Sequence, residues 1–341
     1  MRVGRATGIV VGTAIGGLTV IAALGWWISH LSSTTSPPTC ESKMTRFDGV
    51  PWGCKALPNQ TTSRGLRVHA QETKLIQGID GAILNIDDYA EPVSYSTKLV
   101  PMRRVTCKIS ECVGGRSAPI TGQEKVAGGT DRQIILVDLD RRRTYELYQA
   151  RVDEDGTLRV NADGSVTAGG MSVVDLDGPG NKTADGKNLN ITGAGVSRMF
   201  GLIRAHEIRA AAIDPPTAIP HALQVSLPKR YNCADTWRAP ATKTDGRATG
   251  ACVEEGALLR LDASFECTSM GTRMGQAICS ALQRYGAYNI DNNGSRHMAF
   301  YGQNLRSWAT GDGDYAAAGI DHDYARLDLP LRLLRSYVRG Q

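Results

Sequence analysis

The sequence is poor in aromatic residues and has no marked excess of either charge. Phenylalanine, tryptophan and tyrosine make up 6% of the 341 residues, and 39 basic against 34 acidic residues leave a net charge of +5. Nucleic-acid-binding proteins carry clustered basic patches rather than a small overall excess, so we expect no nucleic-acid partner. The glycines show no three-residue period and no heptads run along the chain, which excludes collagen-like and coiled-coil proteins. A hydrophobic content of 41% is instead typical of a globular chain.

Most catalytic and cofactor-binding motifs are also absent. The sequence contains neither a phosphate-binding P-loop nor a dinucleotide fingerprint, and it has no Cys-x-x-Cys pair that would favour zinc. Residues 195–199 lack the closing glycine of a G-x-S-x-G serine hydrolase motif. His206 and Glu207 are followed by Ala210, where a zinc metalloprotease has its second histidine. We therefore expect neither a metal nor a cofactor.

The clearest signal is an uncharged run at the N-terminus, residues 6–29. About 20 apolar residues suffice to span a bilayer as a helix. Arg2 and Arg5 before the run, and Trp26 and Trp27 near its end, are typical of membrane boundaries. The pattern predicts a cytoplasmic tail at 1–5, a transmembrane signal anchor at 6–29 and a linker at 30–39, with the bulk of the chain outside the cell. A cleaved signal peptide, which would release a secreted protein, is the alternative.

Gly8, Gly12 and Gly16 fall on one face of this predicted membrane helix. Small residues at such spacing let two helices approach closely, so the stripe predicts a homodimer. The alternative is that it reflects only the frequency of glycine in membrane helices.

The cysteines agree with export from the cytoplasm. All eight follow the predicted anchor, and an even number in an oxidising compartment predicts four disulfides. The sequence leaves many connectivities open. The simplest pairs neighbours along the chain: Cys40–Cys54, Cys107–Cys112, Cys233–Cys252 and Cys267–Cys279.

Short strands and tight turns dominate the first half of the body. Residues 133–138 form a β-branched apolar run, 140–143 a turn and 144–150 an alternating strand, which together predict a hairpin. Asp-Gly turns at 155–156 and 163–164 follow soon after. The pattern predicts a β-rich α+β protein, with an antiparallel sandwich or jelly-roll-like body and a few helices behind the membrane helix.

The second half mixes helices and strands. Apolar residues at helical spacing predict helices within 199–213 and at 274–285, the latter closed by Gly286. Pro330 and the apolar residues after it predict another helix at 330–338. Residues 221–227 predict a strand, and 287–301 predict a hairpin. We therefore divide the body into a β-rich half at 40–195 and an α+β half at 196–341, packed together as one body.

A set of stretches along the body carries a recognisable pattern: 47–52, 131–150, 201–208, 220–228, 254–266 and 281–294. Together they resemble a largely uncharacterised family of secreted bacterial β-rich proteins. The family usually shows histidine where this chain has Gln133, an acid where it has His206, and Asp-Trp where it has Arg296 and His297. The resemblance implies a secreted β-rich fold and supplies no reaction.

Charged residues in apolar surroundings are the candidates for a functional site, because a buried charge is costly unless it is paired. They are Arg204, Glu207, His221 and Asp291, with Asp131, Arg132 and Glu146 in addition. We expect Glu207 and His221 to lie close together, because Asp214 and two prolines break the chain between them. Structural ion pairs are the plain interpretation of these residues, and a cleft for chemistry is the other.

Two functions follow from these alternatives. The first is a cell-surface enzyme acting on polysaccharide. A glycoside hydrolase would use Glu207 and Asp291 as its two carboxyl groups, with Glu146 in reserve. A lyase would use His221 as the base and Arg204 to bind a uronate carboxylate. The second is a non-catalytic glycan-binding, adhesion or envelope-scaffold protein. A single cleft holding Glu207, His221 and Asp291 would favour the enzyme.

Overall fold

The computed structural model describes most of the chain after residue 43. The described residues are 44–45, 49–53, 55–61, 65–217, 219–307, 312–320 and 324–339. The predicted tail, anchor and linker at 1–39 lie outside them, and so do Gly8, Gly12, Gly16, Cys40 and Cys54. Within these described ranges, no helix is long and apolar enough to cross a membrane.

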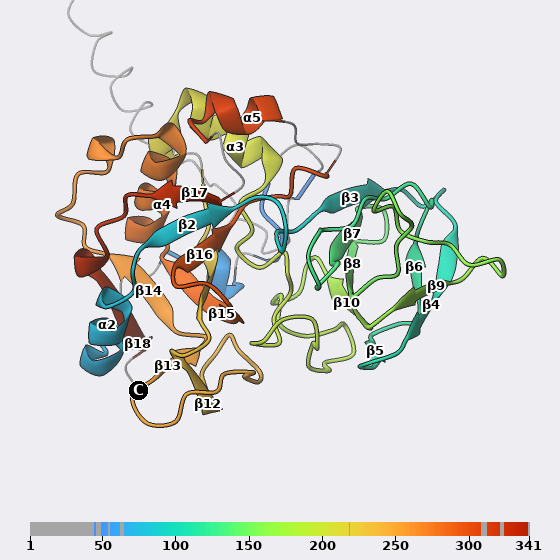
Figure 1. The fold of residues 1–341 in the computed structure, drawn as a ribbon, viewed down its shortest axis with the longest axis horizontal. Helices are drawn as coiled ribbons and strands as arrows, with labels where there is room; N and C mark the ends of the chain where they lie inside the picture. Colours follow the sequence, from blue (N-terminus) through green and yellow to red (C-terminus); the bar gives the residue numbers. More distant parts are fainter. Residues whose placement is uncertain are drawn as a thin grey trace, which may run out of the picture. The chain divides into compact units, whose positions relative to one another are not determined.

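The largest element is a mixed sheet of eight strands (Figure 1). Its order is β1 (Leu66–Val68), β18 (Leu334–Arg339), β14 (Leu258–Leu261), β15 (Ala287–Asn293), β11 (Leu223–Pro228), β16 (Met298–Tyr301), β2 (Ala82–Asn85) and β17 (Tyr324–Leu327). The pairs β11–β15 and β16–β2 are parallel, and the other neighbours are antiparallel. β1 and β2 come from the half of the chain before residue 195, so this sheet joins residues from both predicted halves.

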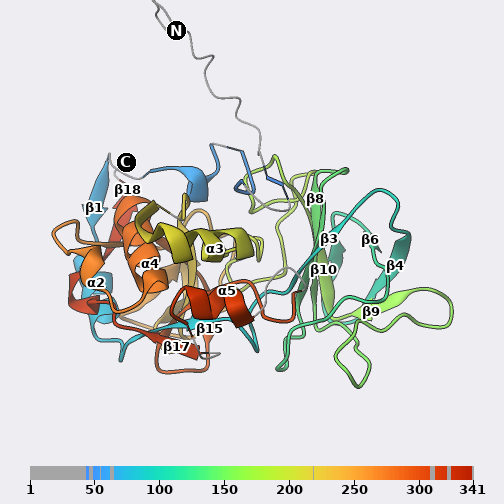
Figure 2. The ribbon, with the colours of Figure 1, turned by 90° about the horizontal axis from the view of Figure 1, so that it is seen from above.

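Four helices accompany this sheet in the described part of the chain: α2 (Ala70–Gln77), α3 (Ala205–Ile213), α4 (Arg273–Arg284) and α5 (Asp312–Ala317). Figure 2 shows α3, α4 and α5 side by side. In α4, Met274, Ile278 and Leu282 recur at helical spacing and are fully buried in the core beneath the helix. The Thr272 hydroxyl accepts a hydrogen bond from the Gly275 N–H at 3.0 Å and caps the helix start. The predicted helix at 274–285 is thus confirmed, and the one within 199–213 begins at Ala205.

A smaller sandwich is built from two further sheets. One has the order β3 (Val93–Ser96), β7 (Ile134–Asp138), β8 (Arg143–Tyr148), β10 (Gly170–Asp175) and β5 (Cys112–Val113), and the other has β6 (Ser117–Pro119), β4 (Met102–Cys107) and β9 (Val166–Ala168). Leu136 and Leu147 of the first sheet share a buried apolar cluster with Val105 and Val166 of the second. A two-stranded pair, β12 (Asn232–Trp237) and β13 (Val253–Glu255), completes the sheets described.

The predicted hairpin at 133–150 is confirmed as β7 and β8, which pair antiparallel. The first four residues of its first strand, Ile134–Val137, are all apolar because both faces of the strand are covered. Ile134 and Leu136 face the sandwich core, whereas Ile135 and Val137 belong to a second buried cluster with Met199. A strand buried on both faces has no polar side to alternate with.

Three details of the predicted fold are wrong. The sheets are mixed rather than antiparallel. Residues 330–338 form a short 3-10 turn, Leu331–Leu333, and then strand β18, in which Leu334 and Ser336 are buried at period two. The apolar positions of this segment fit both a helix and a strand, and pairing with β1 and β14 decides for the strand. β15 and β16 are not a hairpin, because β11 lies between them.

Disulfides join Cys107 to Cys112, Cys233 to Cys252 and Cys267 to Cys279, as predicted from neighbour pairing. Residues from Cys40 to Gln341 form one compact unit.

We expect Gly256→Ala to lower the free energy of unfolding by about 3 kcal/mol or more, because overpacking adds to backbone strain. A Cβ at Gly256 would lie 1.7 Å from the Arg238 carbonyl oxygen, and φ is +85°. Urea denaturation measures the loss. Gly186→Ala is the control, because its φ is +80° but no heavy atom lies within 4 Å of the added Cβ. It should cost only about 1 kcal/mol. Equal losses in the two variants would contradict the clash.

Candidate active site

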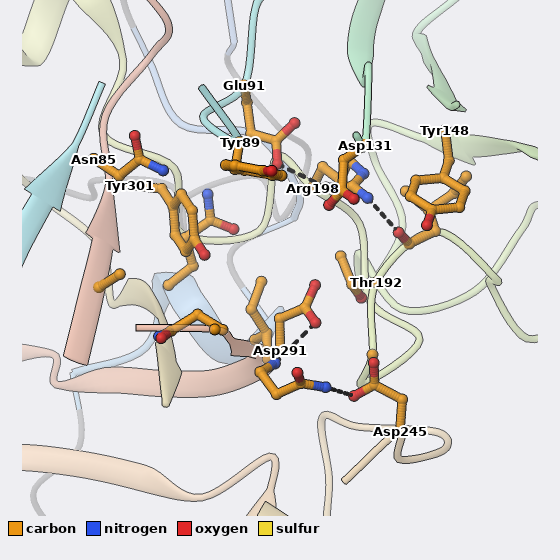
Figure 3. Close-up of a pocket in the computed structure, with 18 of the residues that line it drawn as sticks. Asn85, Tyr89, Glu91, Asp131, Tyr148, Thr192, Arg198, Asp245, Asp291 and Tyr301 are labelled. Atoms are coloured by element: carbon orange, nitrogen blue, oxygen red, sulfur yellow. Dashed lines mark hydrogen bonds and ion pairs between the residues drawn. The ribbon is translucent and has the colours of Figure 1, made fainter. Parts of the chain in front are cut away.

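A pocket of about 770 Å³ opens where the eight-stranded sheet meets the strands and loops of the sandwich (Figure 3). The large sheet contributes side chains from β2, β11, β15 and β16, and the other wall comes from β8 and from irregular segments. The polar residues labelled in the close-up are Asn85, Tyr89, Glu91, Asp131, Tyr148, Thr192, Arg198, Asp245, Asp291 and Tyr301. Four carboxyl groups and two cationic side chains, those of Arg198 and Lys243, line the pocket.

Strained backbone surrounds this pocket. Tyr89, which lines it, has φ +66°, and Arg132 and Gln149, which follow the lining residues Asp131 and Tyr148, have φ +40° and +47°. Residues other than glycine rarely adopt this left-handed conformation, and it persists where the surrounding structure enforces it, often at functional sites. Here the Gln149 N–H donates to the Asp131 carbonyl at 2.7 Å, which ties the two strained turns together.

Arg198 is the central cation of the site. Its Nη1 donates to Glu91 Oε1 at 2.9 Å and its Nη2 to the Ile191 carbonyl at 2.7 Å, and both charged side chains are almost fully buried. Glu146, the reserve carboxylate of the sequence analysis, lies behind this pair and does not line the pocket. It accepts hydrogen bonds from the Arg198 N–H, the Ser197 hydroxyl and the Thr144 hydroxyl. Glu146 therefore holds the segment that carries Arg198.

Several buried polar atoms in the pocket wall have no hydrogen-bond partner among the described residues. They are Glu91 Oε2, Arg198 Nε and Gln224 Nε2, on residues that are at most 5% exposed. A buried polar atom without a partner is costly and uncommon in a native structure. Because the set contains both donors and an acceptor, it matches a ligand rich in groups that can do both, such as hydroxyls.

Two carboxyl groups of the pocket have unusual acidity. Burial raises the pKa of Asp291 to about 7, and the neighbouring charge of Asp245 adds to the effect while Arg198 opposes it. Burial likewise raises the pKa of Glu91 to about 7 against the attraction of Arg198. In Figure 3, Asp131 and Asp291 both point into the pocket from different walls. Asp291 is therefore a carboxyl group that holds its proton at near-neutral pH within reach of a bound ligand.

Tyr148 and Tyr301, which line the pocket, are unsuited to act as bases because their pKa values are raised. Burial raises the pKa of Tyr301, and nearby Asp291 and Glu91 raise it further. Burial and Asp131 raise the pKa of Tyr148. Their hydroxyl groups therefore stay protonated and serve as hydrogen-bond partners.

Of the candidate residues predicted from the sequence, Asp291 lines this pocket, and Arg204, Glu207 and His221 do not. The predicted proximity of Glu207 and His221 is confirmed, since Glu207 Oε1 lies 2.9 Å from His221 Nε2 and both side chains are buried. His221 Nδ1 lies 2.8 Å from the Ala222 carbonyl oxygen. Because both ring nitrogens face acceptors, the charged imidazolium fits this environment best.

Glu207 and Arg204 stabilise the start of α3. Glu207 Oε2 accepts the Arg204 N–H at 2.7 Å and so caps the helix. The Arg204 guanidinium donates to the carbonyls of Thr45 and Gly49 and to the Tyr95 hydroxyl. These contacts tie the first described residues of the chain to the body.

Sequence reasoning missed Glu91, Arg198 and Asp245 because all three lie in irregular stretches without periodicity. Asp131, which precedes the apolar run at 134–137, and Asp291, which follows the one at 287–290, were the pocket residues with a sequence signal.

Among the residues that the structure describes, no group of three or more His, Cys, Asp or Glu side chains could hold a metal ion. Comparisons with protein-family models, curated proteins and solved structures find no match to this chain.

We expect Glu207→Gln to lower the free energy of unfolding by about 3–5 kcal/mol, because it leaves a buried imidazolium unpaired. Burial alone would raise the pKa of Glu207 and lower that of His221, but their mutual attraction reverses both shifts. The lowered carboxyl pKa stabilises the fold above the ordinary pKa of 4.5, and the raised imidazole pKa stabilises it below the ordinary 6.5. The loss should therefore be greatest between these values and shrink on either side.

Urea denaturation at several pH values measures this loss. Asp153→Asn is the control, because it removes an exposed ion pair with Arg159 and should cost no more than about 1 kcal/mol. A loss in Glu207→Gln as small as that of the control would contradict the role of the buried pair.

Proposed function

We propose that this chain is a membrane-anchored, extracytoplasmic glycoside hydrolase that acts on polysaccharide in the pocket of Asp131 and Asp291. The observation that carries the proposal is Asp291, a carboxyl group with a pKa of about 7 in a pocket whose buried donors and acceptors lack partners. Sugar hydroxyls both donate and accept, so a glycan unit suits these atoms. The three disulfides support an oxidising compartment.

The chemistry needs one protonated and one charged carboxyl group. Asp291 gives its proton to the leaving oxygen as the glycosidic C–O bond breaks. Asp131 stabilises the positive charge that develops on the sugar and assists the addition of water, whose hydroxyl ends on the anomeric carbon. The proton that this water releases replaces the one given up by Asp291, which returns the two carboxyl groups to their starting state.

A lyase is less well supported by the same pocket. It needs a base and a cation for the uronate carboxylate. Among the described residues no histidine lines the pocket, and Tyr148 and Tyr301 have raised pKa values. Arg198 is already paired with Glu91, which leaves Lys243 as the cation for a uronate. The carboxyl groups also outnumber the cations, which disfavours anionic glycans. We therefore place neutral and amino glycans ahead of uronates as substrates.

We expect Asp291→Asn and Asp131→Asn each to lower the rate of hydrolysis by about 100-fold or more, since each removes a group needed for proton transfer or charge stabilisation. Reducing-end release from a panel of neutral, amino and uronate polysaccharides measures it. Wild-type activity should fall as the pH rises above about 7, where Asp291 loses its proton. Asp153→Asn, the same change at an exposed site, should keep full activity.

Full activity in either pocket variant would refute the assigned roles. Oligosaccharide binding without turnover on any polymer would favour the non-catalytic glycan-binding alternative instead.

We also expect the protein to fractionate with membranes through residues 6–29 and to resist extraction by alkaline carbonate, because a spanning helix is held by its apolar surface. Deleting residues 1–31 should release the compact unit that begins at Cys40. A mature N-terminus near Trp26 would show a cleaved signal instead.

Crosslinking of the full chain, with and without substitution of Gly8, Gly12 and Gly16, tests the proposed homodimer.

A further inference from the structure

Two carboxyl groups of the pocket meet at one glycine. A Cβ built on Gly193 would lie 2.3 Å from Asp245 Oδ1 and 2.9 Å from Asp291 Oδ1. Both oxygens therefore lie within 2.9 Å of the same point, in space that only the missing side chain of Gly193 leaves open. Asn292 fixes the arrangement, because its N–H donates to Asp291 Oδ1 at 2.8 Å and its side-chain amide donates to Asp245 Oδ1 at 2.6 Å.

A third carboxyl group, that of Glu255, stands behind Asp245 and is fully buried. Its Oε1 faces the Asn232 amide at 3.3 Å, and Asn289 orients that amide by donating to Asn232 Oδ1 at 2.9 Å. Its Oε2 has no hydrogen-bond partner among the described residues. Burial raises the pKa of Glu255 to about 9, and the neighbouring charge of Asp245 adds to the effect. Glu255 is therefore uncharged near neutral pH.

We propose that Asp245, fixed by Asn292, is a positioning residue whose negative charge keeps the proton on Asp291. Asp245 therefore acts on the reaction through the protonation of Asp291, without contacting the glycosidic bond that breaks. This inference rests on the proposed function for its catalytic meaning, whereas the effect of Asp245 on Asp291 can be measured without any substrate.

Asp131 and Glu91 also line the pocket, but Asp245 is the charged neighbour with the largest effect on Asp291. Arg198 and the backbone N–H groups of Asn292 and Gly193 favour the ionised form of Asp291. Tyr148 and Tyr301 remain neutral, and Lys243, which lines the same pocket, is a cation. Burial and Asp245 thus hold the proton against the remaining groups. Of these two, only Asp245 can be removed by one substitution.

Asp245→Asn in the full chain is the test. It removes the charge but keeps a side-chain oxygen to accept from Asn292. Carbon-13 NMR of labelled aspartate carboxyl groups, assigned with Asp291→Asn, follows the titration of Asp291. We expect its midpoint near pH 7 in the wild type to fall by on the order of one pH unit in Asp245→Asn. The alkaline limb of the pH–rate profile should move down by the same amount.

Glu255→Gln is the matched control. It replaces a group that is uncharged near pH 7 and leaves the charge of Asp245 in place, so the titration of Asp291 should move much less. Asp245 is exposed at the pocket rim, and Asp245→Ser is a second variant that should lower the midpoint of Asp291 in the same direction.

An unchanged Asp291 titration in both folded Asp245 variants would overturn the inference, and so would a wild-type midpoint below pH 5. If no glycan is hydrolysed but the titration shifts, the proposed function fails and the positioning effect stands. If glycans are hydrolysed and the titration does not shift, only the inference fails.

Discussion

The pocket depends on burying the charge of Arg198 inside an irregular segment. Residues 191–205 are buried almost without interruption, although most of them belong to no helix or strand. A buried loop must find partners for its backbone and its charges, because water cannot supply them. The Glu146 carboxylate accepts a hydrogen bond from the Arg198 backbone N–H. The Arg198 guanidinium donates one hydrogen bond to the Glu91 carboxylate and another to the Ile191 carbonyl. Glu146 belongs to β8. Glu91 lies between β2 and β3 and bridges to Gln303, just after β16, so one arginine joins the sandwich to the large sheet.

The same burial gives the site its chemistry. In a medium of low polarity, a carboxyl group keeps its proton unless a cation stands close by. Arg198 favours the charged forms of Glu91 and Asp291, but the burial of both outweighs it. A polar network of this kind contributes little net stability, since desolvation offsets the attraction of the charges. Its value lies in fixing the positions of groups that a bound glycan would meet.

Particular residues show how much of the site could be predicted from the sequence. Asp291 was found because it follows the apolar run at 287–290, and the nearness of Glu207 to His221 was expected from the chain break between them. Yet Glu207 pairs with His221 at the start of α3, and Asp291 faces a different space, lined by Glu91, Asp131 and Asp245. Apolar neighbours in the sequence predict that a charged residue is buried. They do not predict which charged residue from a distant part of the chain is buried beside it.

The features that could be predicted correctly from the sequence are local. The helix at 274–285, the β7–β8 hairpin and the three described disulfides between neighbouring cysteines depend on residues close together in the chain. Tertiary structure alone decided that β11 separates β15 from β16, that residues 334–339 are a strand, and that Asp245 meets Asp291 at Gly193. The physical reason is that strand pairing and the acidity of a carboxyl group are set by neighbours in space. Periodicity along the chain records which face is buried, and it carries no information about what covers that face.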